Sequence, residues 1–186
     1  MAKSPKAPLS FTSYALNKCL IGYGGVNGSI NAAIFAGLHA AAEGATFDMG
    51  AVVSDLSFTG ILLGMLLFAC VVPLTRMDLR KNVFKLPAGG AGAFPLVSGS
   101  YAVSILVVGA LACVFMTGIG ALLSLALPAG GATVTGMMIL KGLVCACGGA
   151  VAGYFTICYV VRGQQRADAV AEAMAHYLND VGASIN

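Results

Sequence analysis

The sequence predicts an all-α polytopic membrane protein, with four transmembrane helices arranged as two hairpins and with cytoplasmic N and C termini. Three observations predict this fold class: the composition, the number of long apolar segments, and the placement of the basic residues. Of the 186 residues, 59% are hydrophobic and only 9% are charged, whereas a soluble domain carries about 25% charged residues. So few charges exclude an ordinary soluble enzyme, an intrinsically disordered chain and a nucleic-acid-binding protein.

Four apolar segments are long enough to cross a bilayer. The hydrocarbon core is about 30 Å thick and requires about 20 residues of apolar helix. We expect the four helices at about residues 19–42, 56–74, 101–127 and 134–161. The last two segments are longer than the bilayer requires, so we expect them to tilt or to extend by a turn beyond it.

The basic residues give the orientation of the chain. If the four helices alternate in direction, nine of the ten basic residues fall on one side of the membrane: Lys3, Lys6, Lys18, Arg76, Arg80, Lys81, Lys85, Arg162 and Arg166. Cytoplasmic loops are enriched in Lys and Arg, which predicts a multi-pass protein of the cell inner membrane with a cytoplasmic central loop. We expect no cleaved signal peptide, because the first apolar segment is too long and too polar for one.

The connections and the cysteines carry no recognisable chemical motif. Residues 86–95 are rich in Gly and Pro, which is typical of a linker, and they lack the strand and the Lys-Ser/Thr pair of a P-loop. The six cysteines lie inside apolar segments, where cysteine packs as a small hydrophobic residue. Cys145 and Cys147 are too close in sequence for a zinc site. We therefore expect no metal and no cofactor.

Each apolar segment contains small residues at every fourth position. Such residues form a ridge along which two helices approach closely in a membrane. The third segment has Gly109, Cys113 and Thr117, and the other three have glycine pairs: Gly24 and Gly28, Gly60 and Gly64, and Gly149 and Gly153. These ridges predict a tightly packed bundle. They leave open whether each ridge meets its own chain or a second copy.

Two asparagines place amide groups in the middle of the first segment. Asn27 and Asn31 share a helix face and lie roughly 13 and 20 Å beyond Lys18, on either side of the membrane midplane. Amides at that depth need hydrogen-bond partners. They either bond to neighbouring helices and fix the bundle, or line a route for a solute or an ion.

Three charged or titratable residues lie near the expected outer ends of the helices. Asp55 precedes Arg76 by as many residues as Lys141 precedes Arg162, so Asp55 and Lys141 are expected at similar depth. Either Asp55 caps the second helix while Lys141 extends to the interface, or the two form a pair that guards an outer vestibule. His39, at the end of the first segment, is either an interfacial hydrogen-bonding residue or a group that titrates or binds a metal.

The last part of the chain predicts a cytoplasmic amphipathic helix at residues 163–181, either continuous with the fourth segment or separate from it. Apolar residues recur at three- and four-residue steps along it: Ala167, Val170, Ala171, Met174, Tyr177, Leu178 and Val181. From Arg162 onward the net charge is −1, counted from two arginines and three acidic residues, so the segment differs from a basic helix that binds a lipid surface. We expect it to pack against the central loop or to self-associate.

One short stretch carries a family resemblance. Residues 28–34 (Gly-Ser-Ile-Asn-Ala-Ala-Ile), followed by an acidic loop, by Asp55-Leu56-Ser57 and by a helix with a basic end, resemble small four-helix bacterial membrane proteins of unknown function. The resemblance covers the first two helices better than the last two. It implies a fold and no activity.

The sequence therefore predicts a small integral membrane protein, with a permease or channel-like transporter of an unidentified solute as the leading hypothesis. The residues of the hypothetical route are Asn27, Asn31, His39, Asp55 and Lys141. The alternative is a non-transporting scaffold or a subunit of a larger membrane complex. We expect no enzyme, because no carboxylate lies deep in a segment and no serine has a nearby base. The expected partners are the bilayer and a second copy or another membrane protein, without nucleic acid.

Overall fold

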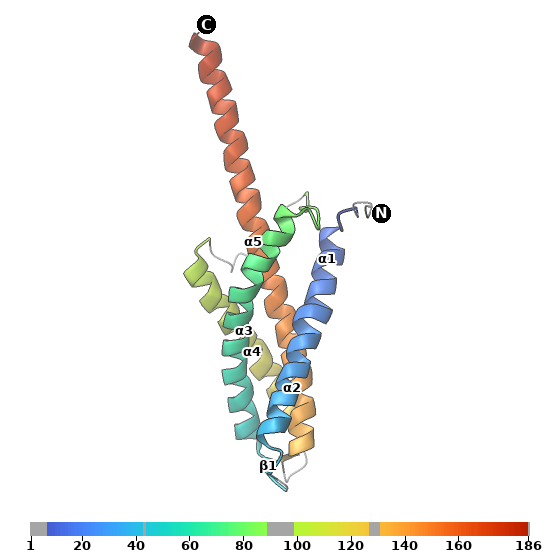
Figure 1. Cartoon of the computed structure of the whole chain (residues 1–186). Coiled ribbons are helices and arrows are strands. Elements are labelled where there is room, and N and C mark those ends of the chain that lie inside the picture. The colour runs from blue at the N-terminus through green and yellow to red at the C-terminus, as the bar shows by residue number, and fades with distance from the viewer. Residues whose placement is uncertain (1–6, 43, 89–98, 127–130, 186) are drawn as a thin grey trace, which may run out of the picture.

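The computed structural model describes residues 7–42, 44–88, 99–126 and 131–185, and most of these are helical (Figure 1). The elements follow in the order α1 (Phe11–Asn17), η1 (Lys18–Gly25), α2 (Val26–Leu38), β1 (Thr46–Phe47), α3 (Met49–Arg80), α4 (Tyr101–Ser124), β2 (Ala132–Thr133) and α5 (Val134–Ile185). The start of α1 and the far end of α5 lie at one end of the bundle, and β1 lies at the other (Figure 1).

Three helices, α3, α4 and α5, are long and apolar enough to cross a membrane. This supports a membrane protein, as expected. The first apolar segment is helical as far as Leu38, but its helix is divided into α1, the π-helix η1, and α2, each of them shorter than a bilayer requires. The fourth crossing, the two hairpins and the cytoplasmic side of the termini stay predictions.

The second helix is longer at both ends than the apolar run that predicted it. It begins at Met49, because the Asp48 carboxylate accepts a hydrogen bond of 2.7 Å from the Ala51 amide and caps the helix. Asp48 and not Asp55 is therefore the cap, and Asp55 lies inside the helix. The helix ends where Asn82 adopts a φ of 52°, with Val83 N bonding to the Asp78 carbonyl in a Schellman arrangement.

The first and last segments also differ from the predicted bounds. Helical structure begins at Phe11 rather than at about residue 19, because the Ser10 hydroxyl accepts from the Ser13 amide and caps α1. It ends at Leu38 rather than at about residue 42. The helix predicted at residues 163–181 is the continuation of α5, which runs without a break from Val134 to Ile185. Residue 127, the predicted end of the third helix, lies outside the described residues.

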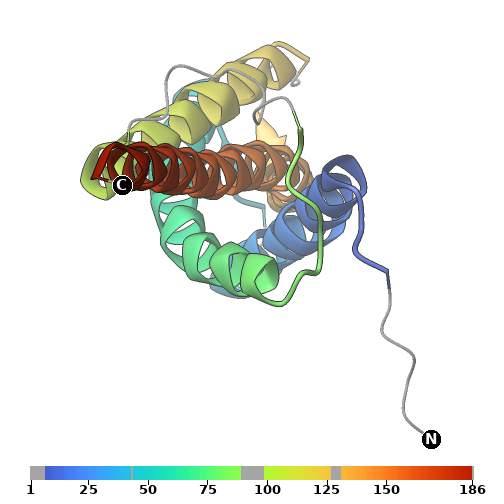
Figure 2. The same cartoon turned by 90° about the horizontal axis from the view of Figure 1, so that it is seen from above.

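The helices that pack against each other are not always neighbours in the sequence. The main contacts of α3 are with α4, those of η1 and α2 are with α5, and α5 also contacts α3 and α4. Seen along the bundle, α5 therefore lies between α4 and the first segment (Figure 2). The last helix is the one that joins the rest of the bundle together.

The predicted glycine ridges lie at these helix contacts, within the chain itself. A methyl group added at Gly28 would lie 2.6 Å from the Gly142 carbonyl oxygen of α5. One added at Gly64 would lie 2.8 Å from the Val108 carbonyl oxygen of α4. The other four glycines of the ridges have similarly close neighbours on another helix: Gly24, Gly60, Gly149 and Gly153. The helices therefore approach too closely at these positions for a larger residue.

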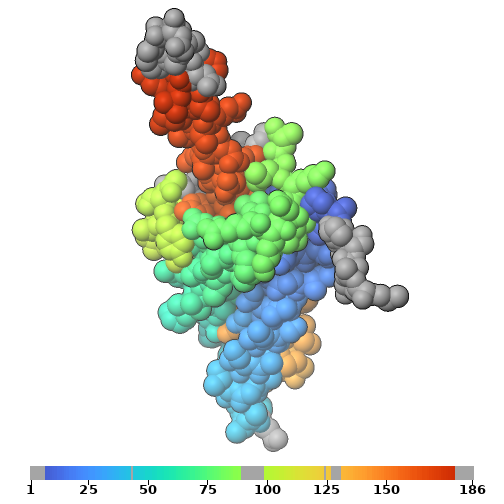
Figure 3. Space-filling view, turned by 45° about the horizontal axis from the view of Figure 1, so that its top comes forward, coloured from blue at the N-terminus to red at the C-terminus, as the bar shows by residue number. Residues whose placement is uncertain are grey.

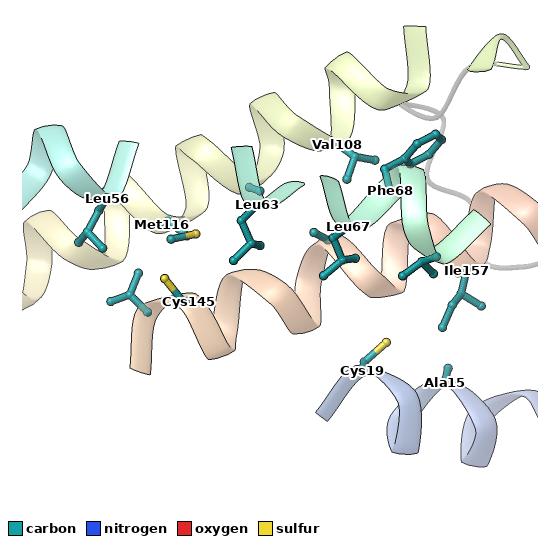
Figure 4. Packing of buried hydrophobic residues seen from close by; sticks show 14 of the residues in the cluster. Ala15, Cys19, Leu56, Leu63, Leu67, Phe68, Val108, Met116, Cys145 and Ile157 are labelled. Carbon is teal, nitrogen blue, oxygen red and sulfur yellow. The ribbon is translucent and has the colours of Figure 1, made fainter. Parts of the chain in front are cut away.

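The core between α3, α4 and α5 is apolar and sulfur-rich. Met116 of α4 and Cys145 of α5 lie beside the leucines of α3 (Figure 4), and both are fully buried. On the outer faces of the same helices large apolar side chains are exposed, for example Val114 at 71% and Leu143 at 61%. An apolar exterior of this kind fits contact with lipid rather than with water.

A two-residue strand pair, which the sequence did not predict, closes one end of the bundle. Thr46 and Phe47 of β1 pair antiparallel with Thr133 and Ala132 of β2. This pairing ties the connection before α3 to the connection before α5.

Candidate functional site

Lys141 and Asp55 form an ion pair between α5 and α3. The Lys141 Nζ atom lies 2.8 Å from Asp55 Oδ1. The Lys141 side chain is 12% exposed and that of Asp55 is 36% exposed, so the pair is largely but not fully removed from solvent. The second carboxylate oxygen, Oδ2 of Asp55, is buried and has no hydrogen-bond partner among the described residues. The pair therefore retains one unused acceptor.

Three aromatic rings in mutual contact adjoin this pair, and Phe35 is the ring that faces Lys141. Lys141 Nζ lies 5.5 Å from the centre of the Phe35 ring, within the range of a cation–π contact. The His39 ring stacks on Phe35 with centroids 4.2 Å apart, and the Phe47 ring meets His39 edge-on. We call Phe35, His39, Phe47, Asp55 and Lys141 the Asp55 cluster. It joins α2, β1, α3 and α5 at one end of the bundle.

The hydrogen bond of His39 fixes the orientation of its ring. Nδ1 lies 3.0 Å from the Phe35 carbonyl oxygen, which only accepts, so Nδ1 carries a proton. In the neutral ring, Nε2 is then the nitrogen that can accept a hydrogen bond. In the described part of the chain no group of three His, Cys, Asp or Glu side chains is arranged to hold a metal. The cluster is an ion pair that contacts a group of aromatic rings through Phe35.

The asparagines do not make the expected hydrogen bonds to neighbouring helices, and the alternative, that they line a route, stays a prediction. Asn27 Nδ2 donates to the Tyr23 carbonyl at 2.6 Å, and Asn31 Nδ2 donates to the Asn27 carbonyl at 2.9 Å. Both amides thus bond within their own helical segment instead of to a neighbouring helix, because the carbonyl four residues earlier is within reach of the side chain. Next to Asn27, η1 and α5 approach each other closely at Gly149 of α5. A methyl group added at Gly149 would lie 2.5 Å from the Tyr23 carbonyl oxygen.

A second polar cluster, which the sequence analysis missed, lies at the other end of the bundle. The Tyr14 hydroxyl donates to Asp78 Oδ2 at 2.8 Å, and Lys18 Nζ lies 3.0 Å from the same oxygen. Burial, followed by the neighbouring Asp78 carboxylate, raises the pKa of Tyr14. The phenol therefore stays protonated and donates. The sequence did hold one signal, since Asp78 is the only acidic residue in the basic run 76–81.

A cavity of about 960 Å³ lies at this same end of the bundle. Its walls come from the end of α3, the residues that follow it, and the middle of α5. The residues of this cavity include neither the two asparagines nor any member of the Asp55 cluster. The structure therefore joins Asp55 directly to Lys141 and links His39 to them through Phe35, whereas the hydrogen bonds of Asn27 and Asn31 do not involve this cluster.

Comparison with protein-family models, with curated proteins and with solved structures found no match to this chain. Its function is therefore inferred from its own geometry.

Proposed function

We propose that the chain is a non-transporting membrane module that assembles with a second copy of itself through the cytoplasmic part of α5. The observation that carries the proposal is the length of this helix. With 52 residues, α5 is about 78 Å long, more than twice the thickness of a bilayer core of about 30 Å. Its second half extends beyond the rest of the bundle (Figure 1).

The extension carries an apolar stripe that nothing in the described chain covers. Val170, Met174, Tyr177 and Leu178 are between 57% and 65% exposed. They follow each other at the spacing of one helix face. In a segment outside the membrane such a face is exposed to water, and burial would stabilise it by about 25 cal/mol for each Å² of apolar surface.

A second copy fits this face better than a lipid surface does. Val170, Met174, Tyr177 and Val181 are spaced by four, three and four residues, as in the seam of a coiled coil. The part of α5 that carries the stripe, residues 167–185, has three acidic residues and no Lys or Arg, so it is not attracted to anionic lipid. Two parallel copies of α5 would bury both stripes against each other.

The packing inside the membrane also supports a module without a transport route. The seam between α2 and α5 is in backbone contact at Gly28, and the seam between α3 and α4 is in backbone contact at Gly64. The amides of Asn27 and Asn31 are used within their own segment. A route along either seam would require these contacts to separate.

The test is the oligomeric state of the full chain in detergent and in nanodiscs, measured by native mass spectrometry. We expect a dimer for the natural protein and a monomer for Met174→Glu, because a carboxylate in the seam loses its hydration on association. Ala169→Glu adds the same charge to the same helix away from the stripe and is expected to stay dimeric. A monomeric natural protein, or an equal effect of both substitutions, would contradict the proposal.

Transport is the second candidate, and one observation favours it. The Asp55 cluster places an ion pair with an unused carboxylate oxygen on two helices that the sequence predicts to cross the membrane. A pair of this kind is a common feature of ion and proton pathways. The test is the flux of K⁺ and H⁺ into liposomes that contain the natural protein or Lys141→Met. A flux that the natural protein raises above empty liposomes and that Lys141→Met changes would favour transport, whereas no flux would exclude these two ions.

A further inference from the structure

The cavity at the end of α3 is lined by an unusual set of charges. Five of its wall residues are basic: Arg76, Arg80, Lys85, Arg162 and Arg166. Among the described residues, none that lines the cavity is acidic. Figure 3 shows this face of the molecule, with the end of α3 and the following residues in green beside α5 in orange.

The acidic side chains closest in sequence to these wall residues are Asp78 and Asp168, and each accepts a hydrogen bond; the donor to Asp168, Gln164, is itself a wall residue. Asp78, on the last turns of α3, accepts from Tyr14 and pairs with Lys18. Asp168, which follows Arg166 on α5, accepts from the Gln164 amide at 2.8 Å. Since the described residues of the wall include no carboxylate, the wall carries a net positive charge. A bound anion would offset it.

The walls are held in place from several directions. Lys85 N donates to the Leu9 carbonyl, and Leu9 N donates to the Val83 carbonyl, both at 2.9 Å. Gln165 Nε2 donates to the Pro87 carbonyl at 3.0 Å and ties the same segment to α5. Together with the turn at Asn82, these bonds fix the backbone of the residues after α3 relative to α5. A site whose backbone is fixed in advance loses less entropy on binding.

The rule that basic residues face the cytoplasm explains why these five residues lie on one side of the membrane. It does not explain why they surround one cavity. Lys81 obeys the same rule and follows Arg80 directly, yet it is not part of the cavity wall. Four of the five basic wall residues are arginines, whose planar guanidinium groups bind phosphate through two parallel hydrogen bonds. The wall also contains the apolar side chains of Leu79 and Phe84 and the ring of Tyr159.

We propose that this cavity binds a phosphate-bearing anion, with the arginines on the phosphate and the apolar wall against the rest of the ligand. Two kinds of ligand carry such a phosphate: an anionic lipid, whose headgroup lies at the edge of the bilayer, and a soluble phosphorylated molecule. Basic pockets between transmembrane helices on the cytoplasmic side commonly bind the former. The cavity is a different surface from the proposed dimer contact, so the failure of one proposal leaves the other standing.

The first arm of the test uses a soluble probe. The full chain is placed in nanodiscs of phosphatidylcholine alone and titrated with pyrophosphate at constant ionic strength, with sodium chloride as the reference. Saturable heat on mixing and a raised thermal unfolding midpoint are expected if the ligand is soluble.

The second arm uses a lipid probe. The full chain is reconstituted in nanodiscs of phosphatidylcholine mixed with phosphatidylglycerol, and native mass spectrometry counts the phosphatidylglycerol that remains bound on release. A fixed number of retained molecules per chain is expected if the ligand is a lipid headgroup.

Three variants decide whether binding is at the cavity. In whichever arm is positive, Arg80→Gln and Arg166→Gln should each weaken binding by about tenfold, the effect of one lost charge-assisted contact. Lys81→Gln removes a neighbouring charge that is also exposed and should leave the affinity within about twofold. The unfolding midpoint of each variant without ligand shows that it is folded. Absence of saturable binding in both arms, or equal weakening by Lys81→Gln and Arg80→Gln, would overturn the proposal.

Discussion

Asp55 and Lys141 are residues whose contact could be predicted in part from the sequence. Their equal separation from the basic helix ends placed both at one depth, and the structure brings them within 2.8 Å of each other. The sequence did not identify Phe35 and Phe47 as members of the same cluster, because no local pattern links residues on α2, β1 and α5. The missed Tyr14–Asp78 contact has the same cause, since its partners are 64 residues apart.

Replacing Lys141 by Met should lower the free energy of unfolding by about 1–2 kcal/mol. The substitution leaves the Asp55 carboxylate without its cation, but the partial exposure of Asp55 keeps the cost below that of a fully buried pair. The measurement is the denaturation midpoint of the purified protein in detergent. The double variant Asp55→Asn with Lys141→Met should recover part of the loss. Failure of the double variant to recover stability would show that Lys141 acts through packing rather than through its charge.

At the scale of whole elements, the amino-acid pattern predicted which segments are helical but not where each helix ends. Apolar runs end where charge begins, whereas helices end where a cap or a left-handed residue stops them, as Asp48 and Asn82 do for α3. The glycine spacing indicated the face through which each helix packs. It did not indicate the partner, because a ridge of small residues is equally suited to any other helix.

The contact between α2 and α5 predicts that two glycines of α2 differ in how much their replacement by alanine destabilises the protein. Gly28→Ala places a methyl group 2.6 Å from the Gly142 carbonyl oxygen, whereas Gly37→Ala meets nothing within 4 Å. We expect the first to lower the free energy of unfolding by about 1–3 kcal/mol. The second should be neutral, or should stabilise the helix by about 0.5–1 kcal/mol. The measurement is the denaturation midpoint of each variant in the same detergent. Equal midpoints for Gly28→Ala and Gly37→Ala would show that α2 and α5 do not pack as described.

At the scale of the whole molecule, α5 determines the arrangement. It contacts α2, α3 and α4 and then continues beyond them as a single helix. An apolar half and an amphipathic half were both evident in the sequence. The sequence left open whether the two halves are continuous, because the polarity changes at residues 162–166 and Gly163 weakens a helix without necessarily ending it.

The topology of four crossings predicts which connections a membrane-impermeant reagent reaches. In a cysteine-free background, Thr46→Cys should react with an impermeant maleimide added outside intact cells. Asn82→Cys should react only after the membrane is opened. Mass spectrometry of the labelled chain provides the measurement. Labelling of both positions from the same side would mean that α3 does not cross the membrane.

The sequence by itself determined the membrane class, the approximate helical segments and the clustering of basic residues at one end. These follow from composition and from local periodicity, which depend on neighbouring residues only. The tertiary structure decided the pairing of α2 with α5 and of α3 with α4, the Asp55 cluster, and the cavity with five basic wall residues. Those features depend on which surfaces meet across long stretches of chain, and close packing admits only some of the combinations that the local pattern allows.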